Sequence, residues 1–218
     1  MSASTGPGNA PLLNRERHIK YWLRCLRTVL PTNYTSNDSN RMTLAFFTLS
    51  ALDLLSALDT HVGAEERVEY INWLYQCQHP EGGFRGFTGT DFGKENRNKQ
   101  NAAWDSANLP GTFFALSTLL VLGDNLERVH RKECLTWIRQ LQCEDGSVGE
   151  VLNADGKPAG TRDVRFSFLA ACVRWMLRVE HEEDNPEDID LDALAASILT
   201  SKVCCHQEEM QTWKCIDW

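Results

Sequence analysis

The sequence predicts an all-α fold built from repeated helical hairpins. Residues 70–87 are echoed by residues 134–151, at a distance of 64 positions along the chain. The residues that align in this register are Trp73 with Trp137, Gln78 with Gln142, Glu81 with Asp145, and Gly82 with Gly146. Each copy has the pattern of an amphipathic helix that ends in a glycine turn. Such internal repetition is typical of stacked helical units.

An apolar segment precedes each copy, and a third such segment follows later in the chain. These segments are residues 42–55, 109–122 and 164–177, with Phe46-Phe47, Phe113-Phe114 and Phe168 at equivalent places. A helix that is apolar nearly all round must be buried on every side, whereas a helix with a charged stripe faces water on that stripe. We therefore expect the apolar helices to form an inner layer and the amphipathic helices an outer one.

The remaining elements follow in chain order. Residues 15–30 have the pattern of an amphipathic helix, which Pro31 should stop. Residues 88–106 form a polar excursion that is longer than a structural connection needs, and such loops are usually functional or disordered. A third outer helix is expected over residues 191–202. We therefore expect a disordered N-terminus (1–14), a helical domain (15–202) and a divergent tail (203–218).

Composition excludes several classes of protein. The chain has 218 residues, a net charge of −8 and a pI near 5.3, which argues against nucleic acid or an anionic membrane as the main partner. The longest apolar run, Met42 to Leu58, is broken by Asp53 and is too short for a transmembrane segment. The eight cysteines come without a signal-peptide pattern, and four lie within apolar helical patterns, so we expect a reduced, cytoplasmic protein.

Five short motifs carry a resemblance to a known family. They are the Gly-Gly-Phe-Arg-Gly turn at 82–86 that follows Gln78, the turn Gln142–Ser147, and the segments Arg41–Phe47, Leu122–Leu126 and Asp163–Phe166. Together they resemble the β subunits of the protein geranylgeranyltransferase type I family, within the protein prenyltransferase β subunits, over roughly residues 15–202. The order and spacing of the motifs make the resemblance specific.

The resemblance implies an α/α toroid of six helical hairpins, in two concentric rings around an aromatic funnel. This chain would supply an incomplete part of that barrel. The family's β subunit forms a heterodimer with an α subunit. The complex transfers a geranylgeranyl group from its diphosphate to the cysteine of a C-terminal Cys-aliphatic-aliphatic-X motif, as in small GTPases, and a zinc ion holds that thiolate.

The resemblance also implies a set of substrate-binding residues. Thr43 corresponds to the floor of the lipid cavity, where a small side chain leaves room for the longer isoprenoid. Asn108, Pro110 and Phe166, together with Thr43, correspond to the pocket for the X residue, and Arg165 corresponds to the peptide and lipid site. Phe46, Phe47 and Phe168 belong to the inner-helix face that lines the aromatic funnel. On pattern alone, the aromatic residues are ordinary core packing and Arg165 is a solvated residue at a helix start.

The resemblance stops after Lys202. The family's zinc-binding Asp, Cys and His and most of its diphosphate-binding residues correspond to positions beyond that point, so we expect no metal, no catalytic residue and no activity on this chain alone. The tail then reads as an altered isoform or a mis-spliced gene. Its Cys204-Cys205-His206 and Cys215 lack the spacing of a structural zinc site.

Two further interpretations stay open. One is a non-catalytic, truncated chain that still binds the α subunit. The other is a farnesyltransferase or another toroid isoprenoid enzyme, such as a terpene cyclase. A cyclase would need an acidic Asp-x-Asp-Asp motif in an apolar pocket, and the sequence has none.

Overall fold

The computed structural model describes residues 13–178 and 188–201. The expected disordered N-terminus (1–14) lies outside these ranges up to residue 12, as does the divergent tail (203–218). The last residue of that N-terminus, Asn14, is ordered as the N-cap of the first helix, with Oδ1 accepting the N–H of Arg17. The described α-helices are α1 (Arg15–Arg27), α2 (Arg41–Leu54), α3 (Leu58–His61), α4 (Ala64–Gln76), α5 (Leu109–Val121), α6 (Arg131–Leu141), α7 (Val164–Leu177) and α8 (Leu191–Thr200). Three short 3-10 helices, at Thr32–Asn40, Thr88–Thr90 and Ala102–Trp104, and an antiparallel hairpin of β1 (Val151–Leu152) and β2 (Pro158–Ala159) complete the elements.

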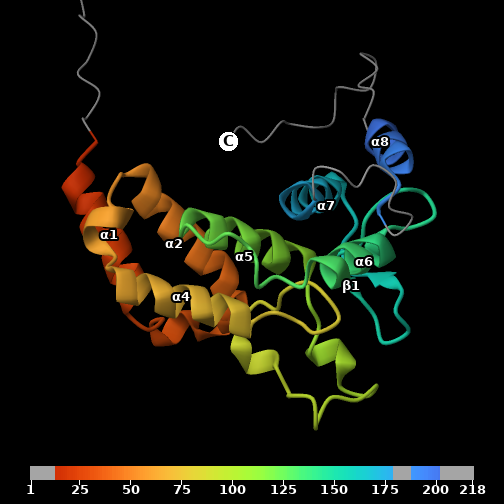
Figure 1. Cartoon of the computed structure of the whole chain (residues 1–218), viewed down its shortest axis with the longest axis horizontal. Coiled ribbons are helices and arrows are strands. Elements are labelled where there is room, and N and C mark those ends of the chain that lie inside the picture. The colour runs from red at the N-terminus through yellow and green to blue at the C-terminus, as the bar shows by residue number, and fades with distance from the viewer. Residues whose placement is uncertain (1–12, 179–187, 202–218) are drawn as a thin grey trace, which may run out of the picture.

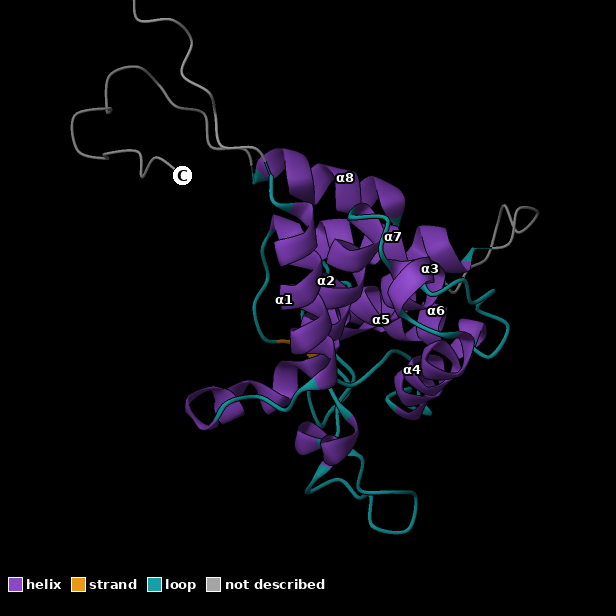
Figure 2. Cartoon of the chain, turned by 90° about the vertical axis from the view of Figure 1, so that its left-hand side faces the viewer, coloured by secondary structure: helices purple, strands orange, loops and turns teal. Residues whose placement is uncertain are grey.

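The helices form the two layers that the repeat predicts. Helices α2, α5 and α7 pack against one another in chain order, with α5 in the middle (Figure 1). Helices α4, α6 and α8 lie outside them, and each has a charged or polar stripe that faces water. The polar excursion over residues 88–106 projects from one end of the layers, as both Figure 1 and Figure 2 show. The hairpin repeat is therefore confirmed.

Helix α1 ends earlier than the sequence predicts. It stops at Arg27 instead of Leu30, because Thr28 adopts an extended conformation and donates both its N–H and its hydroxyl to the carbonyl of Arg24. A proline disfavours helical backbone only at the residue before it, here Leu30, and Thr28 leaves the helix two residues earlier.

The repeated glutamine and glycine form a joint between successive outer helices. Oε1 of Gln78 accepts the N–H of His130, the N-cap of α6, at 2.8 Å. Oε1 of Gln142 accepts the N–H of Asp190, the N-cap of α8, also at 2.8 Å. We call these contacts, together with the glycine turn beside each glutamine, the glutamine–glycine joints. They explain why the motif recurs: each outer helix begins on the turn of the hairpin before it.

The glycine in each joint packs directly on the next outer helix. Gly146 has φ of +79°, and a Cβ there would collide with the carbonyl of Ala193 in the first turn of α8. Gly82 has φ of +110° and lies in the same way against Glu133 of α6. Both positions thus require glycine for its left-handed backbone and for its lack of a side chain.

This packing allows a prediction with a matched control. Gly156 has φ of +72°, but no atom lies within 4 Å of a Cβ built there. Alanine at either position should cost about 1–2 kcal/mol for the left-handed backbone. Gly146→Ala should lose about 1–3 kcal/mol more, because its Cβ forces α8 away. Urea denaturation of the two variants measures the difference, and equal losses would show that the joint does not require close contact.

One face of the inner layer is open to solvent. Phe47 is 53% exposed and Phe168 is 59% exposed, and Leu54 and Trp175 on the same helices are more exposed still. The expectation that the inner helices are buried on every side is therefore wrong for this face. Its physical reason is that no element among the described residues covers these side chains. No helix in the described ranges combines the length and the apolar character needed to cross a bilayer.

Candidate functional site

Five phenylalanine rings from three inner helices form one cluster on this open face. They are Phe46 and Phe47 of α2, Phe113 and Phe114 of α5, and Phe168 of α7. The ring centroids of Phe46 and Phe114 are 4.9 Å apart, and those of Phe113 and Phe168 are 6.1 Å apart. We call this cluster the aromatic face. Because its rings are in mutual contact while two are more than half exposed, it offers an apolar surface to a ligand.

Thr43 lies one turn before the first ring pair of the aromatic face. It is half-buried on α2, and residues three and four positions apart share one side of a helix, so Thr43 lies on the side of Phe46 and Phe47. The N–H of Met42 donates to the carbonyl of Gly86 at 2.8 Å. The start of α2 is therefore fixed by the glycine turn after α4.

Asn108 and Pro110 form the start of α5. Asn108 is the N-cap, and its Oδ1 accepts the N–H of Gly111 at 2.7 Å, while Pro110 occupies the first turn, where its missing N–H costs nothing. The backbone N–H of Asn108 donates to the carbonyl of Phe84 at 3.1 Å. The same glycine turn thus fixes the starts of both α2 and α5.

Arg165 and Phe166 do not join the aromatic face. The Arg165 guanidinium is 79% exposed and forms an ion pair of 2.7 Å with Asp163, the N-cap of α7. The hydrogen bond from Arg165 holds the pKa of the Asp163 carboxyl below its usual range. Phe166 is buried and packs into the hydrophobic core. Of the eight residues that the sequence singles out, the structure therefore brings Phe46 and Phe47 into ring contact with each other, and Phe168 joins the same cluster through Phe113.

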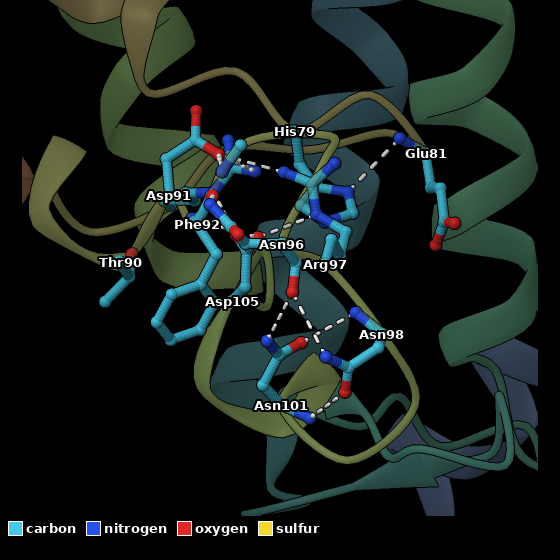
Figure 3. A network of polar contacts seen from close by, with 12 residues as sticks. His79, Glu81, Thr90, Asp91, Phe92, Asn96, Arg97, Asn98, Asn101 and Asp105 are labelled. Atoms are coloured by element: carbon cyan, nitrogen blue, oxygen red, sulfur yellow. Dashed lines mark hydrogen bonds and ion pairs between the residues drawn. The ribbon is translucent and has the colours of Figure 1, made fainter.

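A buried ion-pair network connects the glycine turn to the polar excursion (Figure 3). Nε of Arg85 lies 2.5 Å from Oδ1 of Asp105, and Nε of Arg97 lies 2.6 Å from Oδ2 of the same carboxylate. Arg97 also contacts Asp91 at 2.9 Å, and Arg85 donates to the carbonyl of Gln78 at 2.8 Å. Burial raises the pKa of the Asp105 carboxyl, but the hydrogen bonds from Arg85 and Arg97 outweigh it and hold the pKa below the usual range. Asp105 is thus an anion inside the protein.

Comparison with known proteins decides the family. A sequence profile described as the prenyltransferase alpha-alpha toroid domain matches residues 13–205. The chain belongs to this family. The α/α toroid and the resemblance to prenyltransferase β subunits are therefore confirmed.

Individual relatives agree with this assignment. Geranylgeranyl transferase type-1 subunit beta of Dictyostelium discoideum is 33% identical over 184 residues, which cover 76% of this chain and 50% of the relative. Protein farnesyltransferase subunit beta of Schizosaccharomyces pombe is 25% identical over 178 residues, covering 81% of this chain and 40% of the relative. The solved structure of Candida albicans protein geranylgeranyltransferase-I complexed with GGPP matches with a TM-score of 0.71 and 25% identity, over 87% of this chain and 51% of that chain. The prenyltransferase toroid chain described here thus spans about half the length of its relatives.

The described part of this prenyltransferase toroid chain does not supply a metal site. Within residues 13–178 and 188–201, no three His, Cys, Asp or Glu side chains gather in positions that could hold an ion. Five cysteines in these ranges are free thiols. Burial raises the pKa of Cys77 to about 12 and that of Cys134 to about 11, so both stay protonated at neutral pH and are poor ligands.

Sequence reasoning missed two features of this prenyltransferase toroid. It did not name Phe113 and Phe114 among the substrate-binding residues, although their alignment with Phe46 and Phe47 was the signal that they share a face. It also missed the pairing of Arg85 with Asp105, because nothing in a sequence marks two charges twenty positions apart as partners. The unusual length of the polar excursion was the available sequence signal that this segment has a structure of its own.

Proposed function

We propose that the chain is part of a protein prenyltransferase β subunit of the geranylgeranyl type. In this proposal the complete enzyme transfers a geranylgeranyl group from its diphosphate to the cysteine of a C-terminal Cys-aliphatic-aliphatic-X motif. The aromatic face carries the proposal, because five phenylalanine rings on three inner helices offer an apolar surface that suits an isoprenoid chain. The similarity to geranylgeranyl transferase subunits supports the choice of lipid.

Each predicted residue takes a role in this proposal. Thr43 lies at the floor of the lipid cavity, where its small side chain leaves space for the last isoprene unit. Asn108 and Pro110, at the capped start of α5, line the pocket for the X residue, and the buried Phe166 supports that wall from the core. Arg165 offers a cation to the peptide or to the departing diphosphate, once it leaves Asp163.

The chemical step needs more than the described residues supply. A free thiol is mostly protonated at neutral pH, and a bound zinc ion would deprotonate it while keeping it nucleophilic. The described residues provide lipid and peptide surface instead of zinc ligands. We therefore assign them the binding and orientation of substrates, and we propose that an α subunit completes the enzyme as a heterodimer.

A binding experiment tests the lipid surface directly. The chain is co-expressed with a prenyltransferase α subunit and titrated with a fluorescent geranylgeranyl diphosphate analogue. Phe47→Asp and Phe168→Asp place a charge on rings that are already solvent-accessible, so the fold should survive while lipid affinity falls about tenfold or more. Val29→Asp is the control, since Val29 is 84% exposed and lies outside the aromatic face. Equal losses for all three variants would overturn the proposal.

A farnesyl-specific subunit is the second candidate, because a farnesyltransferase β subunit also matches this chain. The two candidates differ in the preferred lipid. Titration of the same complex with farnesyl and geranylgeranyl analogues decides between them: a clear preference for the shorter chain supports farnesyltransferase.

A further inference from the structure

A cavity of about 490 Å³ lies outside the aromatic face. It is lined by residues of the polar excursion, of α6, of the loop between β1 and β2, and of the turn after α4, and it opens to solvent. The side chains that matter here are His79, Lys94, Lys99, Trp137, Gln140 and Asn153. None of the five phenylalanines of the aromatic face lines this cavity, so the proposed prenyl site does not account for it.

His79 is a buried donor that faces the cavity without a partner. His79 is only 7% exposed, and its Nδ1 accepts the backbone N–H of Glu81 at 3.1 Å (Figure 3). The ring hydrogen must therefore sit on Nε2. Nε2 has no hydrogen-bond partner among the described residues. Every fully buried side-chain nitrogen in those residues has a partner, so Nε2 must be accessible to solvent. Its N–H is thus free to donate to a ligand in the cavity.

The environment keeps His79 neutral. Burial lowers the pKa of His79, and the nearby Arg85 lowers it further. A neutral imidazole with its hydrogen on Nε2 donates one hydrogen bond and remains a donor throughout the neutral pH range.

The charges at the cavity favour an anion. The carboxylate of Asp105 is already held by Arg85 and Arg97, so it offers little repulsion. Lys94 and Lys99 are exposed at the cavity, and neither forms an ion pair with any carboxylate in the described ranges. Glu81 also lines the cavity, so the two lysines exceed this one further carboxylate by a single positive charge, within a chain of net charge −8.

The other walls suit a peptide. Trp137 is buried at the cavity wall and Leu152 lies beside it, so an aliphatic side chain or Cα segment can pack there. Gln140 and Asn153 add side-chain amides, which can donate to a peptide carbonyl.

We propose that this cavity binds a short peptide segment that carries a carboxylate side chain. The carboxylate accepts the Nε2–H of His79 and lies near the ammonium groups of Lys94 and Lys99. The peptide backbone meets the amides of Gln140 and Asn153. The site is distinct from the aromatic face and would recruit an acidic segment of a partner or substrate protein.

Fluorescence anisotropy with the 218-residue chain tests this site. The probe is a labelled, end-capped tetrapeptide Ala-Glu-Ala-Glu, and its uncharged counterpart is Ala-Gln-Ala-Gln. We expect the Glu peptide to bind with affinity that falls as salt rises, and the Gln peptide to bind about tenfold more weakly. Equal binding of the two peptides would overturn the proposal.

Lysine variants test whether binding of the Glu peptide depends on the positive charges at the cavity. Lys94→Gln with Lys99→Gln should weaken binding of the Glu peptide by about tenfold. Lys20→Gln with Lys132→Gln makes the same change in net charge at exposed lysines that do not line the cavity, and it should change affinity less than about twofold. Equal losses in the two double variants would show non-specific attraction and contradict the site.

Histidine variants separate hydrogen bonding from folding. His79→Leu removes the donor and should abolish most of the affinity, whereas His79→Gln keeps an amide N–H donor and should restore part of it. Unchanged affinity in His79→Leu, with an unchanged circular dichroism spectrum, would exclude the histidine contact. A failure of geranylgeranyl binding at the aromatic face would leave these results intact, because Phe47→Asp should not change peptide affinity.

Discussion

Asp105→Asn is expected to lower the free energy of unfolding by about 3–5 kcal/mol. The side chains of Arg85 and Asp105 are 1% and 0% exposed, so water cannot replace the lost carboxylate. Asparagine keeps the size of the side chain but removes its charge, which leaves the buried Arg85 with only the longer, part-exposed contact to Asp91 at 3.4 Å as an ion pair. Urea denaturation of the chain measures the loss.

An exposed ion pair provides the control. Arg41 and Asp38 are joined at 2.8 Å but are 46% and 41% exposed, and such a pair contributes about 0–1 kcal/mol. Asp38→Asn makes the identical chemical change and should therefore have little effect. If Asp105→Asn cost no more than Asp38→Asn, the buried network would not stabilise the fold.

The same pair predicts how stability depends on pH. The folded-state pKa of Asp105 lies below its usual value, so its contribution is present above the unfolded pKa of about 3.9. That contribution is lost as pH falls through the lower folded-state pKa. Asp105→Asn should lack this component, and its unfolding free energy should fall less steeply than that of the unchanged chain on acidification.

Thr43→Trp is expected to shorten the preferred lipid in the complex with the α subunit. Excluding the last isoprene unit removes about five buried carbons, and at about 0.8 kcal/mol per methylene this weakens geranylgeranyl binding by about 4 kcal/mol. The shorter farnesyl chain does not reach that depth and should lose little. Competition between the two diphosphate analogues measures the change in preference.

Thr43→Val is the matched control for this substitution. Valine has nearly the volume and the branching of threonine, so the cavity floor should stay open and the lipid preference unchanged. An unaltered preference in Thr43→Trp would mean that this side chain does not border the lipid. The Phe47→Asp result would still report on the aromatic face independently.

The sequence predicted the helical layers because the two copies of the repeat can be aligned with each other residue by residue. Trp73 with Trp137 and Gln78 with Gln142 align along the chain, and periodicity alone then separates inner from outer helices. The end of α1 was misplaced by three residues, because the extended conformation of Thr28 depends on local hydrogen bonds that no pattern encodes.

The candidate site was less predictable than the fold. Periodicity can place Phe46, Phe47 and Phe168 on apolar helices, but whether a ring is buried or exposed depends on what lies opposite it. The cavity beside His79 could not be predicted either. It is lined by the excursion, by α6 and by the loop between β1 and β2. The ion pairs of Arg85 and Arg97 with Asp105 that fix the excursion follow no periodic pattern in the sequence.

The glutamine–glycine joints have a consequence for the order in which the chain can fold. Gln78 supplies a hydrogen-bond acceptor to a residue 52 positions later, and Gln142 supplies one to a residue 48 positions later. In both cases the turn leaves the ribosome before the helix whose start it holds. Each hairpin can therefore already be folded when the next outer helix is synthesised. The chain can then fold one hairpin at a time, starting from the N-terminus.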